Sequence, residues 1–313
     1  MSYPTVNDIK ACYKNRNLRE FFNISVKCYE YVVVETVHTS EFNGYSMRHR
    51  NGSNIDGVRP IKMDLFIKEG FSEWSDKVIE YLGQPHPDAS SEFRHDQRRL
   101  IYTIQQSVGA YLDLVAEQQA ARKIAGEFFQ GIVGQIFACQ YAMSSGTIAF
   151  SIKDAEGLSA EVKDAIQDSS DDAILKLSFD QLIRPLSHGI LNNMDLTPPC
   201  VVCGVKTTTK DRGVMFYVDK FFYEQTHVQR PKFIAVVLND VQRKRKKGVT
   251  TGISYTFLGG HNKLYRYLLG PLDAYYFVDP PPSALREMED SSSNMKTIDC
   301  MINDDLPVWL SGH

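Results

Sequence analysis

One short segment of the sequence places strong limits on the fold. Residues 201–212 read Val-Val-Cys-Gly-Val-Lys-Thr-Thr-Thr-Lys-Asp-Arg. The β-branched, apolar first half predicts a buried strand over 200–207 that delivers Lys206 to its end. The threonines and the aspartate that follow predict the start of a helix. A buried strand that passes directly into a helix is typical of an α/β core.

The charges of this segment suggest a chemistry. Lys206 lies where the regular strand ends, and Lys210 and Arg212 flank Asp211 at the predicted start of the helix. Cations in this arrangement suit a site that binds a phosphodiester and contacts base edges in the adjoining DNA groove.

Composition narrows the class of protein. The chain has 313 residues, 43% hydrophobic and 23% charged, enough for one large domain or two modest ones. Its formal net charge is −3, so any nucleic-acid surface must be a local basic patch. We find no apolar stretch long enough to cross a membrane and no charged-then-apolar leader, so neither membrane insertion nor secretion is expected.

Six scattered cysteines favour a reduced, cytoplasmic setting. Two of them, Cys200 and Cys203, form a CxxC, but no second pair or His pair follows at the spacing that zinc would need. Positions three apart in a strand face opposite sides, so we expect both to pack as small hydrophobic residues.

The predicted elements alternate between helices and strands. The Pro- and Ser-rich stretch Gln84–Ser91 is the best candidate for a boundary or a long loop. The pattern predicts an α/β fold with a central mixed β-sheet flanked by helices, and an N-terminal α/β subdomain. Residues 1–105 are assigned to that subdomain, for DNA contact, dimerisation or both, and 106–313 to the core. The predicted helices span 71–83, 93–119, 119–143, 157–168 and 211–226, and the predicted strands span 29–37, 146–153, 173–183, 200–207, 232–238, 255–258 and 275–278.

Three charged residues recur at spacings that would bring them to one sheet edge. Asp180 lies late in one predicted strand, and Lys206 lies late in the next. Asp219 falls on the predicted helix 211–226, from which it can point back at the sheet. Metal-dependent phosphodiester hydrolysis needs carboxylates for Mg²⁺ and a cation near the attacking water, so these residues are candidates for such a site.

These residues resemble a known family, the type II restriction endonucleases of the PD-(D/E)xK superfamily, in the branch that cuts CCGG, CCNGG or CCWGG sites. The similarity is closest over 204–212, Gly-Val-Lys-Thr-Thr-Thr-Lys-Asp-Arg, and extends more loosely over about 120–279. It includes segments at 121–130, 179–183 and 232–238, whereas the first third of the chain shows no resemblance. The resemblance implies that residues 106–313 form the nuclease core.

The resemblance assigns the catalytic roles. Asp180 matches the aspartate of the motif, although Phe179 replaces the usual proline, and Lys206 matches the catalytic lysine. In this branch the acid of ExK is missing from the strand, where Gly204 stands, and is supplied by the following helix, where Asp219 stands. Asp180 and Asp219 are therefore expected to hold Mg²⁺, directly or through water.

One departure from the family concerns the earlier helix. The family commonly carries a glutamate there, and this chain has Gln130. Gln130 is still counted among the catalytic residues, because its amide can hydrogen-bond a metal-bound water or ligate weakly through its carbonyl. Glu127, one turn back, is a candidate to compensate for the missing charge.

The resemblance also assigns the residues that read DNA. Lys210, Asp211 and Arg212 match the triplet that reads C/G pairs, the cations donating to guanine and the acid accepting from cytosine. Gly213 stands where the family often has tryptophan, which changes the packing expected behind the triplet. A palindromic target implies that the enzyme acts as a homodimer.

Simpler interpretations exist for each residue. Lys206 could be a strand-end lysine that reaches water, and Asp180 could flank a turn. Asp195 is a rival metal ligand. The triplet could be an ordinary first helical turn with a capping aspartate.

Further basic residues allow two interpretations each. Arg243–Lys247 is either a solvated loop or a phosphate clamp. Arg48–Arg50 and Arg94–Arg99 either contact the DNA backbone or form solvated faces. Arg98 and Tyr102, one turn apart on a predicted helix, could hold an extruded base between guanidinium and ring.

The sequence therefore predicts a Mg²⁺-dependent, sequence-specific endonuclease of double-stranded DNA with CC/GG half-sites. The alternative is a non-cleaving, sequence-specific DNA-binding protein on a nuclease scaffold, its metal site weakened by Gln130. A third possibility is a nuclease that prefers damaged or methylated DNA.

Overall fold

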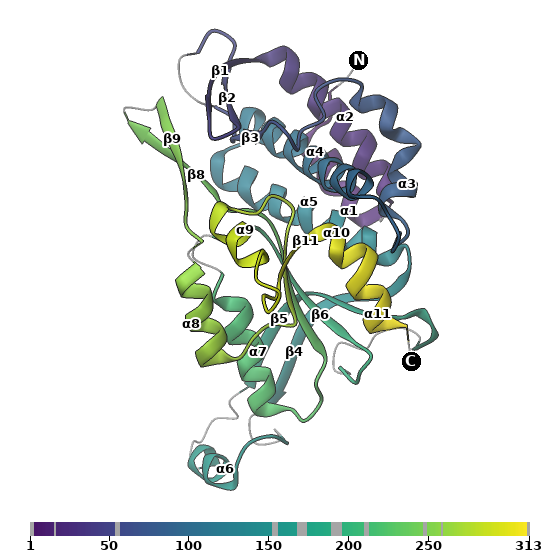
Figure 1. The fold of residues 1–313 in the computed structure, drawn as a ribbon, viewed down its shortest axis with the longest axis vertical. Coiled ribbons are helices and arrows are strands. Elements are labelled where there is room, and N and C mark those ends of the chain that lie inside the picture. Colours follow the sequence, from purple (N-terminus) through teal and green to yellow (C-terminus); the bar gives the residue numbers. More distant parts are fainter. Residues whose placement is uncertain are drawn as a thin grey trace.

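A mixed β-sheet runs through the middle of the molecule (Figure 1). The computed structural model describes residues 3–15, 17–53, 57–151, 156–167, 174–188, 196–209, 213–246, 249–257 and 259–311. Within these residues six strands form the sheet in the order β11-β10-β7-β6-β5-β4. β4, β5 and β6 pair antiparallel, and β6, β7, β10 and β11 pair parallel. The strands are β4 (Tyr141–Ser151), β5 (Ile174–Pro185), β6 (Val201–Thr208), β7 (Lys232–Asn239), β10 (Ala274–Phe277) and β11 (Met295–Thr297).

Helices cover both faces of this sheet. Alternate residues of β6 separate the faces, since Val201, Cys203 and Val205 belong to one apolar cluster and Val202 to another. The cluster on the first face also contains buried residues of α1 (Val6–Asn15), α2 (Leu18–Glu35), α4 (Ser91–Val115), α5 (Gln118–Ala138), α10 (Ile298–Cys300) and α11 (Leu306–Leu310). The second packs on α7 (Met215–Thr226), α8 (Gly259–Leu269) and α9 (Pro282–Met288). Burial on both faces explains why β7 reads as a continuous apolar run.

The two cysteines of the CxxC confirm the alternation predicted for them. Cys200 packs in the cluster under α7, and Cys203 packs in the cluster under α5. Burial raises the pKa of the Cys203 thiol well above its ordinary value, as expected for a cysteine that serves as a packing residue.

The strand predicted over 29–37 is wrong, because most of this segment is the end of α2. Asn17 caps the helix by accepting from the Arg19 amide at 2.9 Å, and Phe21, Cys28 and Val32 lie on its buried stripe. That stripe has helical spacing and packs against α4 and α5. Tertiary packing therefore overrides the strand preference of the valines. A small sheet follows: β1 (Thr36–Phe42), β2 (Tyr45–Arg50) and β3 (Ile61–Lys62).

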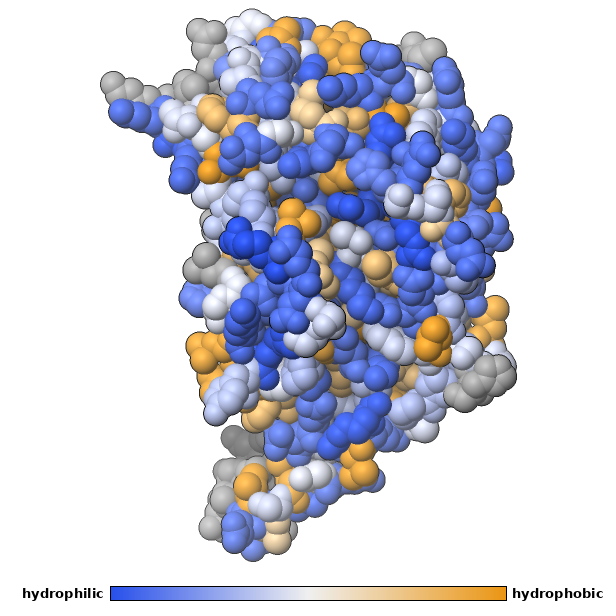
Figure 2. Space-filling view, viewed as in Figure 1, coloured by the Kyte–Doolittle hydropathy of each residue, from blue (hydrophilic) through white to orange (hydrophobic). Residues whose placement is uncertain are grey.

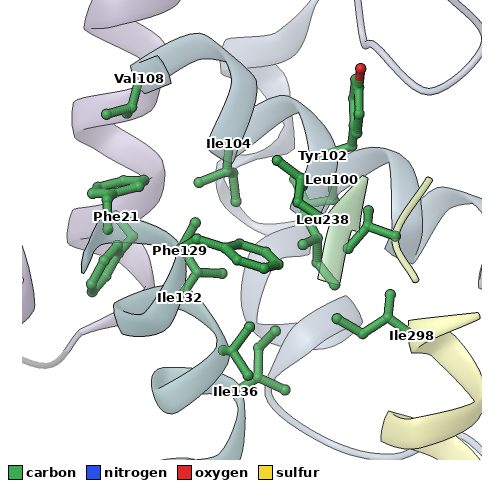
Figure 3. Packing of buried hydrophobic residues seen from close by; sticks show 14 of the residues in the cluster. Phe21, Leu100, Tyr102, Ile104, Val108, Phe129, Ile132, Ile136, Leu238 and Ile298 are labelled. Carbon is green, nitrogen blue, oxygen red and sulfur yellow. The ribbon is translucent and has the colours of Figure 1, made fainter. Parts of the chain in front are cut away.

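One apolar cluster joins the first third of the chain to the rest. Figure 3 shows Phe21 of α2, Val108 of α4, Ile132 of α5, Leu238 of β7 and Ile298 of α10 in that cluster. The boundary predicted between residues 105 and 106 falls inside α4, a helix of 25 residues. The division into 1–105 and 106–313 stays a prediction about roles.

Two predicted elements near the C-terminal end differ from the structure. Instead of a strand over 255–258 in the main sheet, β9 (Val249–Tyr255) pairs with β8 (Val241–Lys246) in a separate hairpin. The sixth strand of the main sheet is β11, which the sequence did not predict. The predicted helix over 71–83 is a helical turn, η1 (Phe71–Ser75), followed by α3 (Lys77–Leu82), and α4, α5, α6 (Ala160–Gln167) and α7 lie close to their predicted ranges. The sequence pattern did not predict α1, α8, α9, α10 or α11, nor the short helical turns η3 (Leu186–His188) and η4 (Met301–Asp305).

None of the helices in the described ranges is both long and apolar enough to span a membrane.

A buried carboxyl lies where the small N-terminal sheet meets the core. Asp279 follows β10, and its Oδ2 accepts a hydrogen bond from the Tyr45 hydroxyl of β2 at 2.6 Å. Asp279 is only 4% exposed. Burial raises the pKa of its carboxyl to about 6, against the opposing effects of the Tyr45 bond and of Lys62.

Replacing this carboxyl should remove a pH-dependent loss of stability. An aspartate in the unfolded chain titrates near pH 4, so the folded protein binds this proton more tightly. The free energy of unfolding therefore falls as the pH rises from about 4 through the folded pKa of about 6. We expect Asp279→Asn to flatten this dependence by up to about 3 kcal/mol, measured by denaturant unfolding at about pH 4 and about pH 8. Tyr45→Phe, which keeps the carboxyl, should retain the pH dependence, and an equal slope in Asp279→Asn and wild type would contradict the assignment.

Candidate active site

A small pocket opens between β5, β6 and α7, and three charged side chains line it. They are Asp180 from β5, Lys206 from β6 and Asp219 from α7. The structure thus brings together three residues that are far apart in the sequence. Apolar residues form the rest of the wall, among them Phe179, Phe216 and Phe233.

A β-bulge positions Asp180. Leu182 pairs with Ser144 and Phe179 pairs with Gly146, so Asp180 and Gln181 together face a single residue of β4. A bulge of this kind bends the strand and re-aims the side chains around it. On the other side of β5, the pairing with β6 ends at Gln181 and Cys203. Asp180 therefore stands where β5 and β6 separate.

The carboxylate of Asp180 accepts hydrogen bonds from β6 at the point where the backbone pairing of β5 with β6 ends. Its Oδ2 accepts from the Val205 amide at 2.7 Å and from Lys206 Nζ at 2.7 Å. Its Oδ1 accepts from Gln130 Nε2 at 2.7 Å. Three donors from α5 and β6 hold this side chain in one orientation.

Lys206 lies near the end of a buried strand, as the sequence predicts. It pairs with Val237 in the parallel ladder of β6 and β7, and its side chain remains 25% exposed. An ammonium that is held by a carboxylate and still reaches the pocket can approach a phosphate group.

Asp219 approaches the same pocket from α7. Burial raises the pKa of Asp219 above its ordinary value; the positive charge of Lys206 opposes this effect, and the negative charge of Asp180 adds to it. The charges of Asp180, Lys206 and Asp219 therefore lie close enough to interact. Helix α7 begins at Met215, four residues later than predicted, so Asp219 lies in its second turn.

Gly204 leaves no room for an acid on β6. A Cβ atom added there would lie 2.3 Å from Cε1 of Phe216, on α7. The close approach of α7 to the strand thus requires a glycine, and the same approach brings Asp219 to the pocket. This packing explains why the acid lies on the helix and why the strand carries no acid.

Gly204→Ala should therefore destabilise the protein and disturb the pocket. The Phe216 ring would have to move, which costs about 1–3 kcal/mol in a packed core. We expect a lower melting temperature and an altered position of Asp219, three residues further along α7. Gly126→Ala is the matched control, because nothing lies within 4 Å of the added methyl group on α5. That control should be neutral or stabilising by up to about 1 kcal/mol, and equal effects of the two changes would contradict the packing argument.

Gln130 reaches the site from behind Asp180. Besides its bond to Asp180, its backbone carbonyl accepts from Gln181 Nε2 at 2.5 Å, which ties α5 to the bulge. Glu127, one turn back, lies 3.9 Å from Lys123 Nζ and does not line the pocket.

Two carboxylates could hold a divalent ion here. Within the described ranges, no group of three or more His, Cys, Asp and Glu side chains is placed to bind a metal. Mg²⁺ is usually held by one or two carboxylates together with waters and substrate phosphates, so Asp180 and Asp219 fit its requirements.

Several residues singled out in the sequence lie outside the described ranges. They are Lys210, Asp211 and Arg212 of the triplet, the rival metal ligand Asp195, and Lys247 at the end of the basic run Arg243–Lys247. Their roles stay predictions.

Asp240 is a buried carboxylate that sequence reasoning missed. It follows β7 and is fully buried, and it accepts from the Thr209 hydroxyl, from the Thr256 amide at 2.6 Å and from the Phe257 amide. It thus holds the side chain of Thr209, directly after β6. The signal in the sequence was an aspartate directly after an apolar strand, a position that also suits a turn.

The proposed base sandwich of Arg98 and Tyr102 is wrong. Tyr102 is fully buried, and its hydroxyl accepts from the Lys62 amide at 2.7 Å. Arg98 Nε donates to the Val278 carbonyl at 3.1 Å. A ring enclosed by the core offers no face to a base.

Comparison with known proteins identifies the fold. No protein-family model matches the chain, and no curated protein matches it. Among solved structures, the chain is similar to the type IIP restriction endonuclease Kpn2I, with a TM-score of 0.65 and 18% identity over 98% of this chain and 97% of that one. It is also similar to the restriction endonuclease PspGI in a complex with substrate DNA, with a TM-score of 0.42 and 12% identity over 79% of this chain and 92% of that one. The predicted restriction-endonuclease-like α/β fold is confirmed by the likeness to Kpn2I.

Proposed function

We propose that this chain is a type II restriction endonuclease that hydrolyses double-stranded DNA with Mg²⁺. The observation that carries the proposal is the meeting of Asp180, Lys206 and Asp219 in one pocket at the edge of the sheet. The likeness in fold to Kpn2I supports it, since that protein is a type IIP restriction endonuclease.

In the proposed mechanism, water attacks the phosphorus atom in line with the leaving oxygen. Lys206, held by Asp180 as an ammonium, orients this water and offsets the charge of the phosphate. Gln130 fixes the other oxygen of Asp180. A Mg²⁺ ion held by Asp180 and Asp219 would supply Lewis-acid polarisation of the phosphate.

We further propose that Lys210, Asp211 and Arg212 read CC/GG half-sites from the major groove. Their residue types match the donor and acceptor pattern of G and C edges. A palindromic target requires two copies of the site in opposite orientation, so the active form is expected to be a homodimer.

Incubation with DNA of known sequence tests this function. The protein should cut a bacteriophage or plasmid genome into discrete fragments with Mg²⁺, and EDTA should prevent cutting. The mapped fragment ends give the recognition site and should contain CC/GG. A specific gel shift without cleavage under Mg²⁺ would favour the non-cleaving DNA-binding protein and overturn the enzyme, and cleavage only of methylated or damaged DNA would overturn the restriction assignment.

A further inference from the structure

The hairpin of β8 and β9 projects beyond the body of the protein (Figure 1). Its strands pair from Val241 and Tyr255 at the base to Lys246 and Val249 near the tip. The base is anchored, because Ile253 packs with Tyr45 and Met47 of β2. Arg243 Nη1 also donates to the Val58 carbonyl at 2.9 Å. A projection fixed at its base in this way is a defined arm.

The outer part of this arm is cationic. Lys244, Arg245 and Lys246 are exposed in β8, whereas the residues before them are half-buried. Within the described part of the chain, no carboxylate forms an ion pair with Lys244 or Lys246. The chain as a whole carries a net charge of −3, so this basic strand is a local concentration of charge. Figure 2 shows the arm as a hydrophilic projection.

The arm starts at the sheet edge that carries the active site. β7 runs parallel to β6, with Lys206 opposite Val237 and Thr208 opposite Asn239. β8 begins two residues after β7 ends, and Gln242 Nε2 donates to the Thr208 hydroxyl at 3.4 Å. Lys244 lies seven residues after Val237, which is level with Lys206. Extended chain of that length spans at most about 25 Å, the length of about seven base pairs.

β9 has no side chain at the position that pairs with Lys244, so its backbone is accessible there. Lys244 pairs with Gly252, and nothing lies within 4 Å of a Cβ atom added there. A glycine inside a strand often marks a place where another backbone approaches closely. The arm therefore offers unpaired ammonium groups beside an unobstructed strand.

We infer that the β8–β9 hairpin binds the phosphate backbone of the DNA that flanks the cleaved site. The inference rests on the proposed function, since it takes DNA to be bound at Lys206. Cations without carboxylate partners bind phosphates and release counterions, which supplies affinity without base readout. An anionic membrane suits the arm less well, because the exposed described residues of β8 and β9 are polar and offer no apolar side chain for insertion.

The test is the salt dependence of DNA binding by a Lys244→Ala/Lys246→Ala variant. Binding to fluorescent duplexes is measured by anisotropy without Mg²⁺ over a range of KCl concentrations. On a long duplex, the slope of log K against log salt should become shallower by about 1.8, the loss of two phosphate contacts. The loss should be equal for specific and random sequences. The Mg²⁺-dependent cleavage rate at saturating DNA should be unchanged, because neither lysine lines the pocket.

Two controls sharpen the test. Lys10→Ala/Lys27→Ala removes two exposed lysines from α1 and α2, outside the arm, and should leave the slope unchanged. A duplex cut back to the recognition site lacks the flanking phosphates that the arm is inferred to bind, so wild type and arm variant should bind it with equal slopes. Equal slopes of wild type and arm variant on long DNA would contradict the inferred binding of DNA by the arm. Binding of the arm to anionic vesicles in place of DNA would contradict it as well. Failure of the wild type to bind any duplex would instead overturn the proposed function, and the inference with it.

Discussion

Lys206→Ala should lower the rate of DNA cleavage by roughly three orders of magnitude while DNA binding persists. The change removes the ammonium group that Asp180 holds at 2.7 Å and that reaches the pocket. Removal of a single preorganised donor that stabilises the charge of a transition state costs about 10²–10³-fold in rate. A lysine that also orients the attacking water should fall at the upper end of this range. Single-turnover cleavage of a duplex with one site measures the loss, and anisotropy without Mg²⁺ measures binding.

A matched control comes from the neighbouring strand. Lys232 begins β7, at the end of the sheet opposite to Lys206, and it forms a comparable pair with Asp273 at 2.8 Å. Lys232→Ala should cleave like the wild type. Full activity of Lys206→Ala would remove this lysine from the mechanism.

Asp180→Asn should lower the rate of DNA cleavage about as much as Lys206→Ala does, and it should also destabilise the fold. The carboxylate accepts from Val205, Lys206 and Gln130, whereas an asparagine turns an NH₂ group toward one or more of these donors. A half-buried donor without its acceptor costs about 1–3 kcal/mol. The variant should also lose a candidate metal ligand. Cleavage assays and denaturant unfolding measure the two effects separately.

Asp273 separates the structural part of this effect from the chemical part. It accepts from Phe233 N at 2.8 Å and from Lys232 Nζ at 2.8 Å, nearly the same pattern as Asp180, but outside the pocket. Asp273→Asn should lower the free energy of unfolding by a comparable amount and keep cleavage. If Asp180→Asn and Asp273→Asn lost the same amount of activity, instability alone would explain both, and Asp180 would have no demonstrated chemical role.

Some features of this protein follow from the sequence alone. The apolar run over 201–205 predicts a buried strand with Lys206 near its end, because burial on both faces needs a continuous apolar sequence. The spacing of Asp180, Lys206 and Asp219 predicts a common location, because neighbouring strands and the helix that follows them meet at one sheet edge. These predictions depend on local periodicity, which the sequence displays directly.

The tertiary structure decided the rest. The valine-rich end of α2 is helical because its stripe packs on α4 and α5, and Tyr102 is buried because it fills the core, whatever its neighbours in the sequence suggest. The bulge that aims Asp180 arises between β4 and β5, and the contact that requires Gly204 arises between β6 and α7. Contacts of this kind depend on which elements come to lie together, and a local pattern carries no record of that choice.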